Sequence, residues 1–167
     1  MNVALIGFMA TGKSTVGRIL ADRLGYSFVD TDEEIVKRTG FCVAELFASE
    51  GETAFRAMER RVVADASASE KTVISCGGGV ALDQGNVEAL RSTSMLVLLT
   101  ASVDEILDRV KGDISRPLLN GGDREKTVTV RLEERTTLYL KAADNVVDTT
   151  GLTLREVAER VIQLLEA

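Results

Sequence analysis

The sequence VALIGFMATGKS, residues 3–14, joins a short apolar run to a turn that fits the phosphate-binding pattern G-x-x-x-x-G-K-[ST]. The run at 3–6 predicts a buried strand, and the stretch at 13–24 predicts the helix that follows it. Glycines let backbone N–H groups converge on one anion, and the helix N-terminus adds partial positive charge. Lys13 can reach the terminal phosphates, and the Ser14 hydroxyl suits Mg²⁺. Because strand, turn and helix stand in this order, the segment predicts a nucleoside-triphosphate site and not a plain glycine-rich turn.

Further apolar runs follow along the chain, separated by amphipathic stretches. We predict strands at 3–6, 26–29, 72–76, 95–99 and 145–147. We predict the remaining helices at 33–38, 43–48, 52–68, 104–110, 127–142 and 153–165. Continuous apolar strands alternating with helices are typical of a parallel sheet covered on both faces. The pattern therefore predicts an α/β fold of three layers, α/β/α.

Composition limits the classes of function. With 167 residues, 45% of them hydrophobic, the chain can form a single domain over 1–167 with its own core. The net charge of −6 argues against a broad nucleic-acid-binding surface, which needs a basic stripe. The chain has no histidine, which excludes imidazole bases, Ser-His-Asp machinery and histidine-ligated zinc. Any anion must therefore be bound by a local arrangement of charges.

The same reading predicts a cytoplasmic protein without a membrane partner. The longest aliphatic run, 95–99, is too short to cross a bilayer, and the apolar start at 1–10 lacks the basic region of a signal peptide. Cys42 and Cys76 are far apart in the sequence, which fits reduced thiols better than a disulfide framework. We expect a monomer.

Two predicted helices place arginines near apolar faces. In the helix at 52–68, Glu59 falls within the apolar stripe, and Arg56 lies three residues before it. Either the two form a structural ion pair, or Glu59 orients Arg56 toward an anionic ligand. Arg135 projects from the apolar face of the helix at 127–142. It is either an arginine with only its stem buried or part of a receptor for a planar carboxylate or phosphate.

Aspartates and glycines follow two predicted strands, at the edge where ligand clefts of α/β proteins form. Asp30 fits the outer shell of Mg²⁺. Asp32 can accept a hydrogen bond from a substrate hydroxyl and take its proton, although a helix N-cap explains Asp32 equally well. The glycines at 77–79 form either a plain turn or a place where a ligand approaches bare backbone N–H groups.

The stretch 111–124 is rich in glycine and aspartate, holds the only proline and predicts a mobile loop. Arg116 in this loop is either a solvated side chain or a residue that neutralises charge during phosphoryl transfer. In the second case the loop would close over the triphosphate and exclude water.

Together these segments resemble the shikimate kinases, and the resemblance covers nearly the whole chain. The matching motifs are GFMATGKS (7–14), FVDTD (28–32), GETAFRAME (51–59), SCGGG (75–79), RPLL (116–119) and ERTTLY (134–139). The first motif marks only a superfamily, whereas the others at these spacings are much more specific.

The resemblance implies transfer of the γ-phosphate of ATP to the 3-hydroxyl of shikimate, with Mg²⁺, in the pathway to chorismate and aromatic amino acids. It implies a P-loop kinase fold of the nucleoside monophosphate kinase type, whose five parallel strands lie in the order 2-3-1-4-5. It also implies a substrate-binding lobe at 31–60 and a lid at 112–124.

The resemblance further implies roles for the matched residues. The expected catalytic residues are Lys13, Asp32 and Arg116. The expected ATP-binding residues are Ala10, Thr11, Gly12, Lys13, Ser14, Thr15, Arg109 and Arg116. The substrate carboxylate would be held by Arg56 and Arg135, with Glu59 orienting Arg56, and the ring hydroxyls would meet Asp32 and the backbone near Gly78 and Gly79. Mg²⁺ would bind Ser14 directly and Asp30 through water. Arg109 matches a position stacked on adenine, which the loop at 148–153 would also flank.

Three other functions share parts of this pattern. A kinase of another small acid or alcohol, such as gluconate, would have the same ATP site and a different substrate lobe. A GTPase-type switch is suggested by DTTG at 148–151, but the chain lacks the N-K-x-D guanine motif. An inactive nucleotide-binding module would bind ATP without transfer, and the presence of Lys13, Asp32 and Arg116 argues against it.

Overall fold

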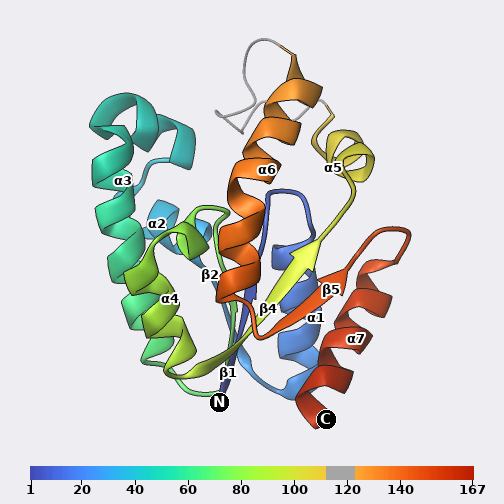
Figure 1. Ribbon diagram of the computed structural model, residues 1–167. Coiled ribbons are helices and arrows are strands. Elements are labelled where there is room, and N and C mark those ends of the chain that lie inside the picture. Colours follow the sequence, from blue (N-terminus) through green and yellow to red (C-terminus); the bar gives the residue numbers. More distant parts are fainter. Residues whose placement is uncertain (112–122) are drawn as a thin grey trace.

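The computed structural model describes residues 1–111 and 123–167 and contains a five-stranded parallel sheet (Figure 1). Its strands are β1 (Asn2–Ile6), β2 (Ser27–Asp30), β3 (Thr72–Ser75), β4 (Ser94–Thr100) and β5 (Asn145–Asp148). They lie in the order β2-β3-β1-β4-β5, so the expected order is confirmed. In the centre, Val3 of β1 pairs with Val73 of β3 and with Met95 of β4. All carboxyl ends of the strands therefore meet at one edge.

Helices cover both faces of the sheet, which confirms the three-layer prediction. They are α1 (Lys13–Leu24), α2 (Thr31–Thr39), α3 (Val43–Ser67), α4 (Gln84–Arg91), α5 (Val103–Val110), α6 (Arg124–Ala142) and α7 (Leu154–Glu166). Helices α1 and α7 pack together on one face, while α3, α4 and α6 lie over the other (Figure 1). No helix in the described part of the chain is long and apolar enough to cross a membrane.

The apolar run of β1 is buried on both sides. Val3 and Leu5 pack into the core shared with α1 and α7, whereas Ala4 and Ile6 pack into the core under α3, α4 and α6. Successive strand residues point to opposite faces, so a strand between two helical layers needs apolar residues at every position. Full burial of one such aliphatic side chain contributes about 1.5–3 kcal/mol.

Helix α4 was missing from the sequence prediction. It is only 8 residues long and begins at a side-chain cap, where Asp83 accepts hydrogen bonds from the Gly85 and Asn86 N–H groups. Its sequence contains Gly85 and Asn86, which are weak helix formers. A segment this short shows too few apolar positions for its period to be recognised.

Helix α3 consists of two helical stretches on either side of a kink at Gly51, whose φ of 82° and ψ of 171° are not helical. The two separate helices predicted at 43–48 and 52–68 are therefore confirmed. Between α2 and α3 lies a small core of its own, formed by Ile35, Leu46, Phe55 and Val62. Three of these four residues fall within the predicted substrate lobe at 31–60.

Helix α6 begins earlier than predicted. Asp123 caps it by accepting a hydrogen bond from the Lys126 N–H, and Arg124 is its first residue. The last two residues of the predicted lid at 112–124 are thus the cap and the first residue of this helix. The rest of that prediction, including Arg116 and the RPLL motif at 116–119, lies outside the described residues.

Candidate active site

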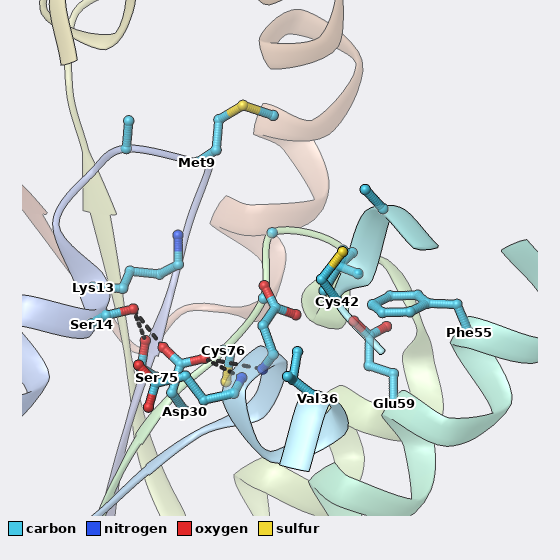
Figure 2. A pocket seen from close by; sticks show the side chains of 18 of the residues that line it. Met9, Lys13, Ser14, Asp30, Val36, Cys42, Phe55, Glu59, Ser75 and Cys76 are labelled. Carbon is cyan, nitrogen blue, oxygen red and sulfur yellow. Dashed lines mark hydrogen bonds between the residues drawn. The ribbon is translucent and has the colours of Figure 1, made fainter. Parts of the chain in front are cut away.

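A cleft of about 770 Å³ lies at the carboxyl edge of the sheet, between the phosphate-binding turn, α2, α3 and the glycine turn after β3. Figure 2 shows Lys13, Ser14, Asp30 and Ser75 on one side of it and Phe55 and Glu59 on the other. The predicted site residues that line the cleft are Ala10, Gly12, Lys13, Ser14, Thr15, Asp30, Asp32, Arg56, Glu59, Gly78, Gly79 and Arg135. The structure thus brings residues from five separate motifs to one place.

The phosphate-binding turn has backbone conformations that few residue types can adopt. Gly7 has a φ of 142°, and a Cβ there would lie 2.4 Å from the Leu99 carbonyl oxygen. Ala10 has a φ of 61°, in the left-handed region that costs a non-glycine residue energy. The first turn of α1 has no side-chain cap, so its N–H groups remain available to an anion.

Lys13 and Thr11 both stabilise this turn through the Phe8 carbonyl. The buried Lys13 donates from Nζ over 2.7 Å, and Thr11 donates from Oγ1 over 2.9 Å. Thr11 is not among the residues that line the cleft. Its backbone N–H, and not its side chain, is therefore the group that could contact a phosphate.

The two carboxylate oxygens of Asp30 accept hydrogen bonds from three neighbours. Its Oδ2 accepts a 2.5 Å hydrogen bond from the Ser14 hydroxyl, which also lies 3.3 Å from the Ser75 hydroxyl. Its Oδ1 accepts from the Asp32 and Glu33 N–H groups at 3.0 and 3.1 Å, so it caps α2. The alternative that Asp32 is the N-cap is wrong, because Asp30 holds that position. The oxygen donors of Ser14 and Asp30 fit Mg²⁺.

Asp32 lies in the first turn of α2 and lines the cleft. A Cβ on Gly77 would lie 2.6 Å from one of its carboxylate oxygens, so only glycine leaves room for it. The Gly77 N–H also donates a 2.8 Å hydrogen bond to the Thr31 hydroxyl. This contact holds the start of α2 against the glycine turn.

Arg56 and Glu59 form the ion pair that their spacing predicts. Arg56 donates from Nη1 to Oε1 of Glu59 over 2.9 Å. Glu59 is 1% exposed, whereas the Arg56 side chain is 21% exposed and lines the cleft. Burial raises the pKa of Glu59 despite the opposing charge of Arg56. Glu59 is thus buried while the Arg56 side chain remains accessible from the cleft, which favours an orienting role for Glu59.

Arg135 is 8% exposed, so its guanidinium is buried together with its stem. The idea that Arg135 buries only its stem is therefore wrong. Its Cζ lies 5.8 Å from the centre of the Phe8 ring, a cation–π arrangement. A Cβ on Gly78 would lie 3.6 Å from its Nη1, and one on Gly79 would lie 2.2 Å from Nη1 of Arg56. Two guanidinium groups, one from α3 and one from α6, therefore flank the glycine turn.

Arg109 lies outside the lining of the cleft, behind the phosphate-binding turn. It donates to the Ala10 carbonyl over 2.9 Å, to the Thr149 hydroxyl over 3.4 Å and to Glu105 over 2.5 Å. Glu105 also accepts a 2.6 Å hydrogen bond from the Gly151 N–H. Arg109 thus stands beside the loop at 148–153, and its contact with adenine stays a prediction.

Sequence reasoning missed an apolar wall of the cleft. Its members are Met9, Val36, Val43, Phe47 and Phe55. Apolar residues that face a cleft follow the same period as residues that face a core, so periodicity alone cannot separate the two.

Cys42 and Cys76 also line the cleft, and neither forms a disulfide. Cys42 is exposed at the N-cap of α3. Cys76 is buried, and this burial raises the pKa of its thiol.

Comparison with known proteins finds similar sequences and structures. A family model described as shikimate kinase matches residues 9–166. The shikimate kinase of Pelotomaculum thermopropionicum is 43% identical over 165 residues, which cover 99% of this chain and 95% of the relative. That of Thermodesulfovibrio yellowstonii is 41% identical with the same coverage. Among solved structures, shikimate kinase from Acinetobacter baumannii in complex with shikimate has a TM-score of 0.95 and 35% identity, covering 98% of this chain and 92% of that one. The enzyme from Aquifex aeolicus has a TM-score of 0.85 and 36% identity, with 99% and 96% covered.

Proposed function

Because this chain belongs to the shikimate kinase family, we propose that its cleft transfers the γ-phosphate of ATP to the 3-hydroxyl of shikimate. The products are shikimate 3-phosphate and ADP, on the route to chorismate and the aromatic amino acids. The observation that carries the assignment is the pair of guanidinium groups, from Arg56 and Arg135, in a cleft that also contains the phosphate-binding turn. A guanidinium fork matches a planar carboxylate such as that of shikimate.

The carboxylate would set the orientation of the shikimate ring. Arg56, held by Glu59, and the buried Arg135 approach it from two helices, so it can accept several charge-assisted hydrogen bonds. Burial strengthens these bonds, because less water competes for the charges. The ring hydroxyls would then face Asp32 and the backbone at Gly78 and Gly79. This placement brings the acceptor hydroxyl toward the phosphate-binding turn.

Phosphoryl transfer depends mainly on position and on neutralisation of charge. Lys13 and the uncapped N–H groups of α1 would stabilise the charge on the transferred phosphoryl group. Asp32 would orient the acceptor hydroxyl and accept its proton. The same charge-neutralising role is proposed for Arg116, which lies outside the described residues, from its sequence motif alone.

Ser14 and Asp30 would hold Mg²⁺, with Ser14 as a direct ligand and Asp30 acting through water. When bound, Mg²⁺ neutralises charge on the β- and γ-phosphates of ATP. The 2.5 Å hydrogen bond between Ser14 Oγ and Asp30 Oδ2 keeps these two oxygens next to each other, beside Lys13.

The substrate lobe, the adenine contact, the oligomeric state and the cellular compartment are also part of this proposal. We assign 31–60 as the substrate lobe, and Arg109 with the loop at 148–153 as the adenine contact. The phosphate-binding turn, Arg56 and Arg135 line one cleft within a single chain, and we propose an active monomer. The free thiols of Cys42 and Cys76 favour a reducing compartment such as the cytoplasm.

Release of ADP from a panel of acceptors tests the reaction. We expect turnover with ATP and shikimate, none with gluconate or nucleoside monophosphates, and little with GTP in place of ATP. EDTA should abolish turnover, and added Mg²⁺ should restore it. Absence of ADP release with shikimate, while ATP still binds, would contradict the proposal and favour an inactive nucleotide-binding module.

The buried Glu59 predicts how substrate affinity depends on pH. Its raised pKa means that acidification removes its negative charge, and with it the partner of Arg56, at a higher pH than for an ordinary glutamate. We expect the KM for shikimate to increase as the pH falls through this pKa, measured between about pH 5 and 8. Glu59→Gln should have a higher KM that no longer shows this dependence.

Glu52→Gln is the matched control, because it removes the exposed second partner of Arg56 and should keep the pH dependence. An unchanged pH profile in Glu59→Gln would contradict the orienting role. The stability of the fold depends on pH in the opposite direction to substrate affinity. Because folding raises the pKa of Glu59, protonation of Glu59 stabilises the folded protein fully at pH values below the pKa of the unfolded chain. This stabilisation is lost as the pH rises through the pKa of Glu59 in the folded protein.

A further inference from the structure

Tyr139 is a buried residue of the ERTTLY motif to which the roles above assign nothing. It lies on α6, one helical turn after Arg135, and is 2% exposed. Its hydroxyl donates a 2.6 Å hydrogen bond to the carbonyl oxygen of Gly78. One face of one helix therefore presents both a guanidinium and a hydroxyl to the same glycine.

This hydrogen bond determines which way the peptide between Gly78 and Gly79 is turned. The peptide is trans and planar, so the Gly79 N–H points opposite to the Gly78 carbonyl and hence away from Tyr139. Within 1–111 and 123–167, neither the Gly78 nor the Gly79 N–H donates a hydrogen bond to another group. Both glycines line the cleft. The Gly79 N–H is thus a donor that the fold leaves for a ligand.

A peptide between two glycines needs such an anchor. Glycine reaches backbone conformations that other residues avoid, so this peptide can rotate at little steric cost. The Tyr139 ring is itself held by packing in the core that it shares with Phe8 and Val128. Burial raises the pKa of Tyr139 despite the opposing contact with Arg135, so the hydroxyl is a protonated donor at neutral pH.

We propose that Tyr139 is a positioning residue for shikimate: its hydroxyl fixes the Gly78–Gly79 peptide so that the Gly79 N–H donates to a ring hydroxyl. The glycine turn lies next to Arg56 and Arg135, the two groups that would hold the carboxylate of the same ring. This inference rests on the proposed function. It adds a residue that touches neither substrate and acts through the backbone.

Tyr139→Phe tests the proposal, because it removes only the hydroxyl and keeps the ring. We expect the KM for shikimate to increase about 3- to 10-fold, the effect of losing one neutral hydrogen bond. The kcat should stay within about twofold and the KM for ATP should not change. Tyr26→Phe is the matched control, since Tyr26 is the other tyrosine and packs on the opposite face of the sheet. It should behave as the wild type.

A second measurement needs no variant. In the wild-type protein, titration with shikimate should shift the amide resonance of Gly79 more than those of Gly85 and Gly151, whose N–H groups already have acceptors. Equal shikimate KM values for Tyr139→Phe and the wild type would overturn the inference, as would an unaffected Gly79 amide. A fall in kcat with equal increases in both KM values would indicate a general structural role and also overturn it. If the wild type itself fails to phosphorylate shikimate, the proposed function fails instead.

Discussion

Replacing Lys13 with methionine is expected to lower kcat for shikimate phosphorylation by about 1,000-fold, as measured by single-turnover transfer from ATP. Lys13 is the buried cation at the start of α1, and its Nζ already lies in the turn, 2.7 Å from the Phe8 carbonyl. Methionine retains the length and the apolar stem of lysine and removes the charge. The charge on the transferred phosphoryl group would then lose its nearest cation among the described residues of the turn.

The effect should be confined to the transfer step. We expect the shikimate affinity of Lys13→Met to stay within about threefold of the wild type, since Lys13 is assigned to the phosphoryl group and not to shikimate. Lys37→Met is the matched control, because Lys37 is an exposed lysine on the outer side of α2. A Lys13→Met enzyme that keeps more than about a tenth of wild-type kcat would contradict the assigned role.

Replacing Arg135 with alanine is expected to lower kcat/KM for shikimate by about 100- to 1,000-fold. The guanidinium is buried over the Phe8 ring and beside Gly78, so water cannot readily take its place. A carboxylate bound there would lose a charge-assisted partner in a poorly solvated site. Arg135→Lys should recover only part of the loss, because lysine keeps the charge without the planar fork.

Two controls distinguish loss of carboxylate recognition from general damage. Arg131→Ala removes an arginine one turn earlier on α6 that is half-exposed and, within the described residues, makes only a 3.9 Å ion pair with Glu134, so it should leave kcat/KM unchanged. The methyl ester of shikimate lacks the carboxylate charge. It should be a poor substrate for the wild type, with little further loss in Arg135→Ala. Equal discrimination against the ester by both enzymes would rule out the contact.

Much of the fold could be predicted because its signals are local. The apolar run of β1 and the glycine pattern after it lie within 14 residues, and both are explained by burial and by backbone geometry. The strand order came only from the resemblance, since pairing of β1 with β3 and β4 depends on contacts far apart in the sequence. Helix α4 was missed because its cap at Asp83 and its eight residues carry too little periodic signal.

For the candidate site, too, some features could be predicted from the local sequence and others could not. The spacing of Arg56 and Glu59 predicts their pairing, because residues three apart on a helix are neighbours. The sequence pattern suggested Asp32 as a possible cap of α2, whereas Asp30 is the residue that caps it, because the helix begins earlier than the predicted 33–38. Tyr139 looked like an ordinary core residue, because the period of α6 reveals the buried face and not the carbonyl that its hydroxyl reaches.

The two oxygens of Asp30 tie the nucleotide side of the cleft to the acceptor side. One accepts from Ser14, and the other caps the helix that begins beside Asp32. A shift of Ser14 on nucleotide binding would therefore act on the helix that carries the acceptor group, which is a thermodynamic linkage between the two substrates. By reciprocity, bound shikimate would change nucleotide affinity by the same factor. Removal of the Asp30 carboxylate would consequently uncouple the two substrates, and its effect could not be attributed to a lost metal contact alone.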